Sequence, residues 1–193
     1  PLLYQIGVRS LTLTWSHRSW AADGDLESKT GGGLTEFGRR IVHQMNELGM
    51  LIDISHMSER GFWDVLDTST KPVIGSHNCC RALCDHRRNL DDDQIRAISR
   101  SGGVIGITYV ETFIDPCAPS LEKLLDHIEH AATVGGVDCV GLGSDFDGGG
   151  ELLHDASHTP RIMEGLLRRG WSNEDLKKIL GLNHLRVFEK VCG

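Results

Sequence analysis

Short apolar segments of strand length alternate with segments of helical periodicity along this sequence, and this alternation restricts the possible folds more than any other feature. The strand-like segments are bounded by Gly, Pro or polar residues: SLTLTW (10–15), MLIDIS (50–55), PVIGS (72–76), GVIGITYV (103–110) and CVGLGS (139–144). Because most of these runs are apolar at successive positions, both faces of each strand should be covered, which is typical of a parallel sheet between helices.

Helical patterns fill the intervals between these segments. The first predicted helix begins after a cap at Thr35 and stops at Gly49, with apolar residues at helical spacing: Phe37, Ile41, Met45 and Leu48. Further helices are predicted over 58–69, 91–103 and 119–136, and the tail predicts two or three more, with Ser172 capping the second. This β-α order fits an open doubly wound sheet or part of a (β/α)8 barrel. In both, ligands bind beyond the carboxyl ends of the strands.

Length and charge restrict the function. The 193 residues suffice for one core, so we expect a single domain over 1–193. The net charge of −7 argues against nucleic acid as a partner. No apolar run is long enough to cross a bilayer, and no signal peptide is recognised. The chain opens without Met, flush against a strand, which suggests a fragment or a processed product.

Histidines and carboxylates follow the predicted strands. His56 and His77 each come directly after a serine at a strand end, His17 follows the first strand, and Asp145 and Asp147 follow the last. A lone histidine in such a position is more often structural, but two in successive strands with an aspartate indicate a metal site, because imidazole and carboxylate suit Zn²⁺. The remaining histidines carry no such signal, and His127 and His130 are expected on the solvated face of a charged helix.

Four segments together resemble the membrane (renal) dipeptidase family, and its bacterial members more closely: GGLTEFGRRIVHQMNELGMLIDISHMS, PVIGSHNCCRALCDHRRNLDDDQIRAI, VGLGSDFDG and NHLRVFEKV. The resemblance runs from Leu3 to Val191. It implies a TIM-barrel-like α/β metallohydrolase of the amidohydrolase type, of which this chain supplies the C-terminal five β-α units and extra C-terminal helices. It also implies a two-zinc site that hydrolyses dipeptides with a metal-bound hydroxide, and in some members β-lactams.

The resemblance assigns roles to individual residues. His56 and His77 match two histidine ligands of one zinc. Arg88 matches the arginine that grips the terminal carboxylate of the substrate, a task suited to a planar fork of donors; from the residues alone, Arg87 or Arg88 would more often be a surface charge. Asp145 matches the aspartate that contacts the substrate and handles the proton, whereas Asp147 is expected to shape the turn.

Three departures from the family pattern limit these roles. The His-x-Asp pair and bridging glutamate of the family match nothing here and would lie in three upstream β-α units, so we expect an incomplete barrel and at most one zinc in this chain alone. Trp15 stands where animal members have a histidine, and no role is assigned to His17. No hydrophobic tail follows that would indicate a lipid anchor, and the compartment stays open, with the cytoplasm favoured.

Two alternatives to a zinc dipeptidase stay open. One is an inactive truncated or pseudo-enzyme fragment, and the other is a related metal-dependent amidohydrolase that acts on another amide. A homodimer is compatible with the sequence. Cys84 and Cys117 match positions near a disulfide of animal relatives, and we expect them to be near neighbours that are bonded only if the protein is exported.

Overall fold

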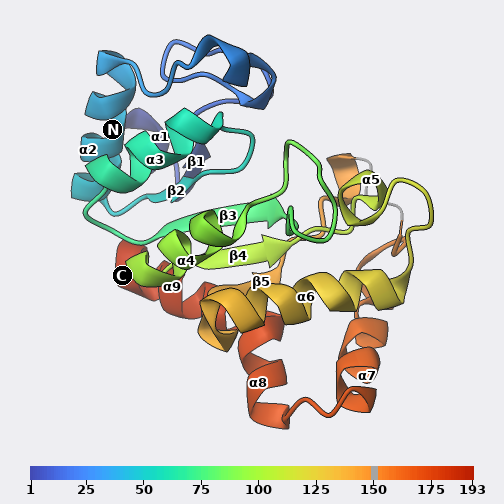
Figure 1. Ribbon diagram of the computed structural model, residues 1–193. Coiled ribbons are helices and arrows are strands. Elements are labelled where there is room, and N and C mark those ends of the chain that lie inside the picture. The colour runs from blue at the N-terminus through green and yellow to red at the C-terminus, as the bar shows by residue number, and fades with distance from the viewer. Residues whose placement is uncertain (149–151) are drawn as a thin grey trace.

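A five-stranded parallel sheet organises the molecule, with its strands paired in chain order (Figure 1). The computed structural model describes residues 1–148 and 152–193. The strands are β1 (Ser10–Thr12), β2 (Leu51–Asp53), β3 (Val73–Asn78), β4 (Val104–Ile107) and β5 (Val140–Leu142). Each lies where the sequence predicts a strand, and β3 continues past the predicted end at Ser76 through His77 to Asn78. The α/β class and the parallel sheet are therefore confirmed.

Four helices follow the first four strands and cover one face of the sheet: α2 (Glu36–Leu48), α3 (Glu59–Thr68), α4 (Asp92–Ser101) and α6 (Leu121–Gly135). Each begins at a side chain that accepts a hydrogen bond from the first turn, and these caps are Thr35, Ser58, Asp91 and Ser120. Gly49 ends α2 in the left-handed conformation, as predicted. The buried face of α2 is centred on Val42 and Met45, however, and Phe37 is exposed.

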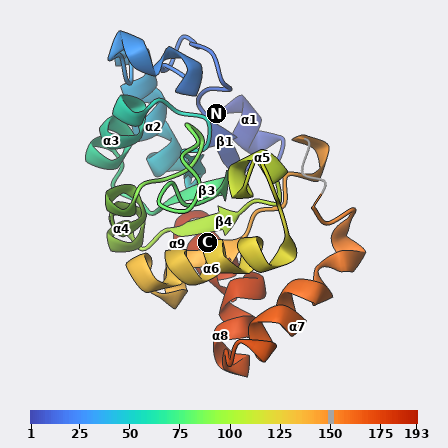
Figure 2. The same cartoon turned by 45° about the vertical axis from the view of Figure 1, so that its right-hand side comes forward.

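The tail forms α7 (Pro160–Arg168), α8 (Asn173–Lys177) and α9 (Asn183–Cys192), with a π-helical turn (η5, Lys178–Leu182) before α9. Ser172 caps α8, as the sequence predicts. In Figures 1 and 2 the tail lies below the sheet and its last helix, α9, runs along the side away from α4. Two short helices were not predicted, α1 (Leu2–Gln5) and α5 (Glu111–Ile114).

The two faces of the sheet bury different side chains. Ile52, Val73 and Ile105 belong to the main core beneath the covering helices. Side chains alternate along a strand, so their neighbours Leu51, Ile74 and Val104 face the other way, where Val187 and Val191 of α9 cover them. One step further toward the carboxyl ends, this second face carries polar side chains, and the apolar cluster therefore forms the floor beneath a polar rim.

Both edge strands of the sheet are open. Within the described residues, β1 pairs only with β2, and β5 pairs only with β4. A closed barrel requires each of these edges to pair with a further strand. Among the helices of the described residues, none has the length and apolar composition of a membrane-spanning segment.

Candidate functional site

The two strand-end histidines meet at the rim. His56 follows β2 and His77 lies near the carboxyl end of β3, and their Nε2 atoms are 2.8 Å apart. Their ring centroids are 4.8 Å apart. The prediction that these nitrogens lie within about 5 Å, the spacing of two ligands on one zinc, is confirmed. Their role as metal ligands stays a prediction.

An irregularity in the sheet aims His77. The pairing of β3 with β4 shifts between Gly75 and Asn78. Over this interval β3 contains one residue more than β4, as in a β-bulge. Such bulges re-aim side chains and occur next to active sites. As a result the neighbouring side chains of Ser76 and His77, which would point to opposite faces of a regular strand, lie together, with 2.7 Å between Ser76 Oγ and His77 Nδ1.

His56 and Asp145 hold an unusual backbone conformation. Among the described residues other than glycine, these two have positive φ angles, 69° for His56 and 72° for Asp145. A non-glycine residue in this region costs about 1–3 kcal/mol and persists only where its surroundings enforce it. The His56 carbonyl accepts hydrogen bonds from the Asp25 backbone N–H at 2.9 Å and from Thr14 Oγ1 at 3.2 Å. Backbone strain of this kind clusters at functional sites, so its presence at two predicted site residues is consistent with a site at the rim.

Arg88 reaches the same rim from the loop between β3 and α4. Arg88 is 5% exposed, and its Nη2 donates to His77 Nε2 at 2.8 Å. Asn78 Nδ2 donates to the Arg88 carbonyl at 3.0 Å and so ties the loop to the end of β3. On the other side, Asp145 Oδ2 lies 4.0 Å from His77 Nε2. The prediction that Arg88 faces the same mouth as the two histidines and Asp145 is confirmed in its geometry.

The sequence could not distinguish Arg87 from Arg88, and the structure separates them. Arg87 donates from Nε to Asp25 Oδ2 at 2.6 Å, and its side chain is 54% exposed. Asp25 is buried, and its second oxygen, Oδ1, has no hydrogen-bond partner. Nε of Arg88 is also without a partner. Unpaired buried polar atoms are rare and costly, and here two of them lie within the candidate site.

Burial and positive charge favour the neutral form of both histidines. Burial, followed by the charges of Arg88 and His77, lowers the pKa of His56 from 6.5 to about 4. Burial and the charge of Arg88 also lower the pKa of His77, although Asp145 and Asp53 oppose this shift. The neutral imidazole is the form that binds metal ions.

The residues fit a zinc ion in part. His77 Nε2 presents a lone pair, since it accepts from Arg88, and His56 Nε2 lies beside it. Within residues 1–148 and 152–193, however, no cluster of three or more His, Cys, Asp or Glu side chains is arranged to hold a metal ion. The described rim therefore offers two imidazole ligands and lacks the third protein ligand of an ordinary zinc site.

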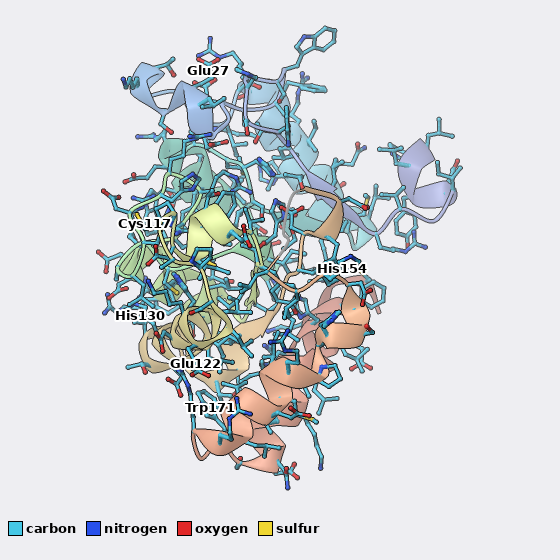
Figure 3. All side chains as sticks on the ribbon, turned by 90° about the vertical axis from the view of Figure 1, so that its right-hand side faces the viewer. Glu27, Cys117, Glu122, His130, His154 and Trp171 are labelled. Atoms are coloured by element: carbon cyan, nitrogen blue, oxygen red, sulfur yellow. The ribbon has the colours of Figure 1, made fainter. Side chains whose placement is uncertain are left out.

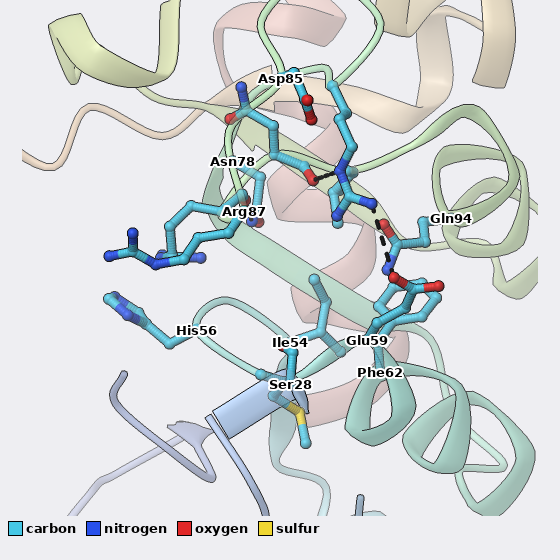
Figure 4. A pocket seen from close by; sticks show the side chains of 14 residues that line it. Ser28, Ile54, His56, Glu59, Phe62, Asn78, Asp85, Arg87 and Gln94 are labelled. Carbon is cyan, nitrogen blue, oxygen red and sulfur yellow. Dashed lines mark hydrogen bonds and ion pairs between the residues drawn. The ribbon is translucent and has the colours of Figure 1, made fainter. Parts of the chain in front are cut away.

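A cavity of about 290 Å³ opens beside His56. Its walls come from the loop after β2, the start of α3 and the loop that carries the two arginines, and Figure 4 shows His56 and Arg87 on the same side of it. Charged side chains of both signs line it, among them Glu59, Arg81 and Asp85. The cavity has room for a small polar ligand next to His56 and Arg88.

Other candidate residues lie outside this rim. His17 is exposed and faces Glu27, with 3.6 Å between His17 Nδ1 and Glu27 Oε1. Asp147 is exposed in a short 3-10 helix (η3, Phe146–Gly148). Figure 3 shows His130 on α6 and His154 in the loop before α7. Trp15 is 73% exposed, and its ring centroid lies 6.1 Å from that of His56.

The prediction for His127 is wrong. Instead of lying on a solvated face, His127 is 1% exposed. Its Nδ1 accepts a hydrogen bond from the Cys80 backbone N–H at 3.0 Å, and its Nε2 lies 3.1 Å from the Ile114 carbonyl. The charges around it in the sequence suggested solvent, but the loop from β3 and the short helix α5 cover this side of α6.

All six cysteines are free thiols in the structure. Cys84 is buried and its Sγ contacts the Thr112 carbonyl at 3.6 Å, whereas Cys117 is exposed. Burial, followed by the charges of Asp115 and Asp85, raises the pKa of the Cys84 thiol. Whether these two thiols bond on export stays a prediction.

Sequence reasoning missed several polar residues that support the site, chiefly Asp53, Ser76, Ser16 and Asp25. Asp53 is buried in the middle of the apolar run LIDIS. A charged residue is seldom buried without partners, so its position within an otherwise apolar strand is a signal that could have identified it.

Comparison with known proteins shows the family to which this chain belongs. The sequence model described as membrane dipeptidase (peptidase family M19) matches residues 1–192. Dipeptidase verJ of Clonostachys rogersoniana is 40% identical over 98% of this chain and 50% of its own length. Dipeptidase 3 of Rattus norvegicus is 37% identical over 97% of this chain and 40% of its own length. The chain therefore spans about half the length of these curated relatives.

Solved structures of other proteins share the fold of this chain. A metallopeptidase from Rhodobacter sphaeroides, liganded with a phosphinate mimic of L-Ala-D-Ala, superposes with a TM-score of 0.91 at 31% identity, over 98% of this chain and 57% of that one. A zinc-bound amidohydrolase from Burkholderia multivorans superposes with a TM-score of 0.64 at 14% identity, over 98% of this chain and 69% of that one, which shows a shared fold only. The fold is consistent with part of a TIM-like barrel.

Proposed function

Because the chain belongs to the membrane dipeptidase family, we propose that it supplies the metal-binding and carboxylate-binding half of a zinc-dependent dipeptidase. The observation that carries this proposal is the convergence of His56 Nε2 and His77 Nε2, 2.8 Å apart, beside Arg88. Two neutral imidazoles next to a buried guanidinium suit a substrate that has both a bond to be polarised and a free carboxylate.

His56 and His77 would hold one zinc ion through Nε2. Zinc in such a site supplies Lewis-acid polarisation of the scissile carbonyl and lowers the pKa of water. The site needs further protein ligands, which are absent from the described residues. We therefore expect the isolated chain to bind at most one zinc, weakly.

Arg88 would orient the substrate and Asp145 would handle the proton. The fork of the guanidinium can form two parallel hydrogen bonds to the terminal carboxylate of a dipeptide. For this, the guanidinium of Arg88 must turn from His77 Nε2 toward the cavity, which Arg88 already lines. Asp145 Oδ2 is 4.0 Å from His77 Nε2, close enough to accept a proton from water near that atom and to return it to the leaving amine.

The open edges of the sheet support a place within a larger barrel. A (β/α)8 barrel would close if β1 and β5 each paired with a strand from three further β-α units. The chain covers 40–50% of the length of the curated relatives compared above, which leaves room for such units. We propose that residues 1–193 form one structural domain with those units, and that their side chains complete the metal site.

Two alternatives predict other outcomes. A related metal-dependent amidohydrolase would act on an amide without a free carboxylate, which disagrees with a buried arginine beside the histidines. An inactive fragment would retain the fold without hydrolysis. A homodimer stays a prediction, which light scattering on the purified protein would test.

The decisive experiment measures zinc content and hydrolysis of L-Ala-D-Ala, both for the 193-residue chain and for a longer protein that carries the upstream units. We expect hydrolysis by the longer protein alone, and loss of zinc from its His56→Ala and His77→Ala variants. The matched control is His130→Ala, which removes a histidine outside the rim. A longer protein that holds zinc but cleaves only amides without a carboxylate would favour the amidohydrolase, and one that cleaves neither would favour the inactive fragment.

A further inference from the structure

A buried polar layer lies between the apolar floor of the sheet and the two histidines. Its centre is Asp53 on β2, which is 5% exposed. Thr12 on β1 and Ser76 on β3 approach it from the neighbouring strands. Side chains two residues apart share a face, so Asp53 lies directly above Leu51 of the apolar floor. A charged side chain in this position needs a full set of partners to be tolerated.

Asp53 has such a set. Its Oδ1 accepts from the backbone N–H groups of Ser55 at 3.0 Å and Ser76 at 2.9 Å. Its Oδ2 accepts from Thr12 Oγ1 at 2.9 Å and from Ser76 Oγ at 2.5 Å. Because backbone N–H groups can only donate, Oδ1 acts as an acceptor, and the carboxylate draws the hydroxyl protons toward Oδ2.

The Ser76 hydroxyl has one proton, and the carboxylate is its nearest acceptor. A weaker choice is Ser55 Oγ at 3.3 Å. Because the Ser76 hydroxyl donates its proton in the hydrogen bond to Asp53, Ser76 Oγ can only accept from His77 Nδ1, which is 2.7 Å away. The nitrogen must then be the donor, so this side of the ring carries the N–H.

The opposite side of the ring gives the same answer independently. Arg88 Nη2 lies 2.8 Å from His77 Nε2. A guanidinium has donors and no acceptor, so Nε2 must present a lone pair. Both neighbours therefore select one tautomer of His77, with the proton on Nδ1 and the free electron pair on the nitrogen that faces His56.

His56 has no comparable support. Ser16 Oγ lies 3.3 Å from its Nδ1, and the unpaired Asp25 Oδ1 lies 4.0 Å away. Since His77 Nε2 accepts, the 2.8 Å contact between the two Nε2 atoms makes His56 the donor. The two histidines thus differ. His77 already has the tautomer that binds a metal ion through Nε2, whereas His56 must first move its proton from Nε2 to Nδ1.

We infer that Ser76 and Asp53 are positioning residues that fix the tautomer and orientation of His77 for the metal ion. This deepens the proposed function and rests on its zinc site. Polar groups that hold the second nitrogen of a metal-binding histidine raise its basicity and fix its ring, and their loss typically costs 10–100-fold in metal affinity. Here the hydroxyl of Ser76 transmits the effect of the carboxylate, and the bulge in β3 makes the contact geometrically accessible.

The test uses the 193-residue chain and the longer protein, with three substitutions. Ser76→Ala removes the hydroxyl, Ser76→Thr retains it, and Thr12→Ala removes another hydroxyl from the same Asp53 oxygen without touching His77. Zinc affinity by calorimetry should fall about 10–100-fold in Ser76→Ala and stay near the unmodified value in the other two. Circular dichroism checks that each variant folds.

A second readout needs no metal. In the metal-free chain, nitrogen-edited NMR of the imidazoles should place the His77 proton on Nδ1 and show it protected from exchange with water. Ser76→Ala should lose that protection, and Ser76→Thr should keep it. If Ser76→Ala does not fold, the resonance of the unmodified chain still decides.

A proton on Nε2 of His77 would overturn the inference, as would a folded Ser76→Ala variant of unchanged zinc affinity. The proposed function would survive either result, because it needs only that the histidines bind zinc. If instead neither the unmodified chain nor the longer protein binds zinc, the proposed function fails, and the position and protection of the His77 proton still decide whether Ser76 and Asp53 orient the ring.

Discussion

The rim at the carboxyl ends of β2 and β3 and the corner where α5 packs on α6 each bury a histidine, but they treat it differently. In the corner, both nitrogens of His127 are matched to backbone groups, the Cys80 N–H and the Ile114 carbonyl. At the rim, His77 faces the guanidinium of Arg88 and the Nε2 of His56. Burial lowers the pKa of both histidines. A lowered pKa therefore does not separate these two histidines, whereas the partners of their nitrogens do.

Unpaired atoms and strain also separate the two regions. The rim contains Asp25 Oδ1 and Arg88 Nε without partners, and the positive φ angles of His56 and Asp145. Buried polar atoms are normally paired because each unpaired one costs about 1–3 kcal/mol. The unpaired atoms and the strained backbone of the rim therefore cost folding free energy, which is expected of a ligand-binding site.

Replacing the rim histidine should have the largest effect. In the longer protein, His77→Ala should lower kcat/KM for a dipeptide by about 1,000-fold or more, about 4 kcal/mol of transition-state stabilisation, because the proposed metal ligand is lost. Its melting temperature in the metal-free form should change little. Steady-state kinetics measure kcat/KM and calorimetry measures the melting temperature. A large loss of stability with retained kcat/KM would show that His77, like His127, has a structural role.

The corner histidine should show the opposite behaviour. His127→Ala leaves the Cys80 N–H and the Ile114 carbonyl unpaired and opens a cavity, so the chain should lose about 3 kcal/mol of unfolding free energy. Denaturant titration measures this loss, with His130→Ala on the same helix as the control. The folded fraction of the longer protein should keep its kcat, and a fall in kcat without destabilisation would contradict the structural role of His127.

The two adjacent arginines sharpen the description of the rim. Arg88→Lys should raise KM for dipeptides about 10-fold while zinc content stays the same, because an ammonium cannot form the paired hydrogen bonds of a guanidinium. Arg87→Lys, whose side chain is half exposed and paired with Asp25, should leave KM nearly unchanged. Unchanged KM in Arg88→Lys would remove Arg88 from the site.

The smallest effect concerns pH. Burial lowers the pKa of His127 below its ordinary 6.5, so the unfolded chain binds this proton at a higher pH than the folded chain does. Stability is therefore retained above pH 6.5 and falls as the pH drops below 6.5 toward the lowered value. Unfolding of the metal-free chain across this range measures the slope. His127→Ala should have a shallower slope, and an equal one would show that other histidines account for it.

Local sequence determined most of the secondary structure. The apolar runs gave all five strands, because a strand buried on both faces needs them. Thr35, Gly49 and Ser172 marked helix ends correctly because capping depends on neighbouring residues alone. The short helices α1 and α5 carry too few residues for a periodic pattern. The exposed position of Phe37 shows that spacing predicts a helix before it predicts which side is buried.

The sequence also placed His56, His77 and Arg88 at one rim, because parallel strands end at the same edge and the family motifs mark those positions. Tertiary structure alone decided the rest. The bulge in β3 brings Ser76 onto His77, although strand alternation separates adjacent side chains. Packing of distant segments buries His127 and surrounds Asp53 with donors from the two neighbouring strands, β1 and β3. The partners of a polar atom are contacts between residues far apart in the chain, and such contacts exist only once the chain is folded.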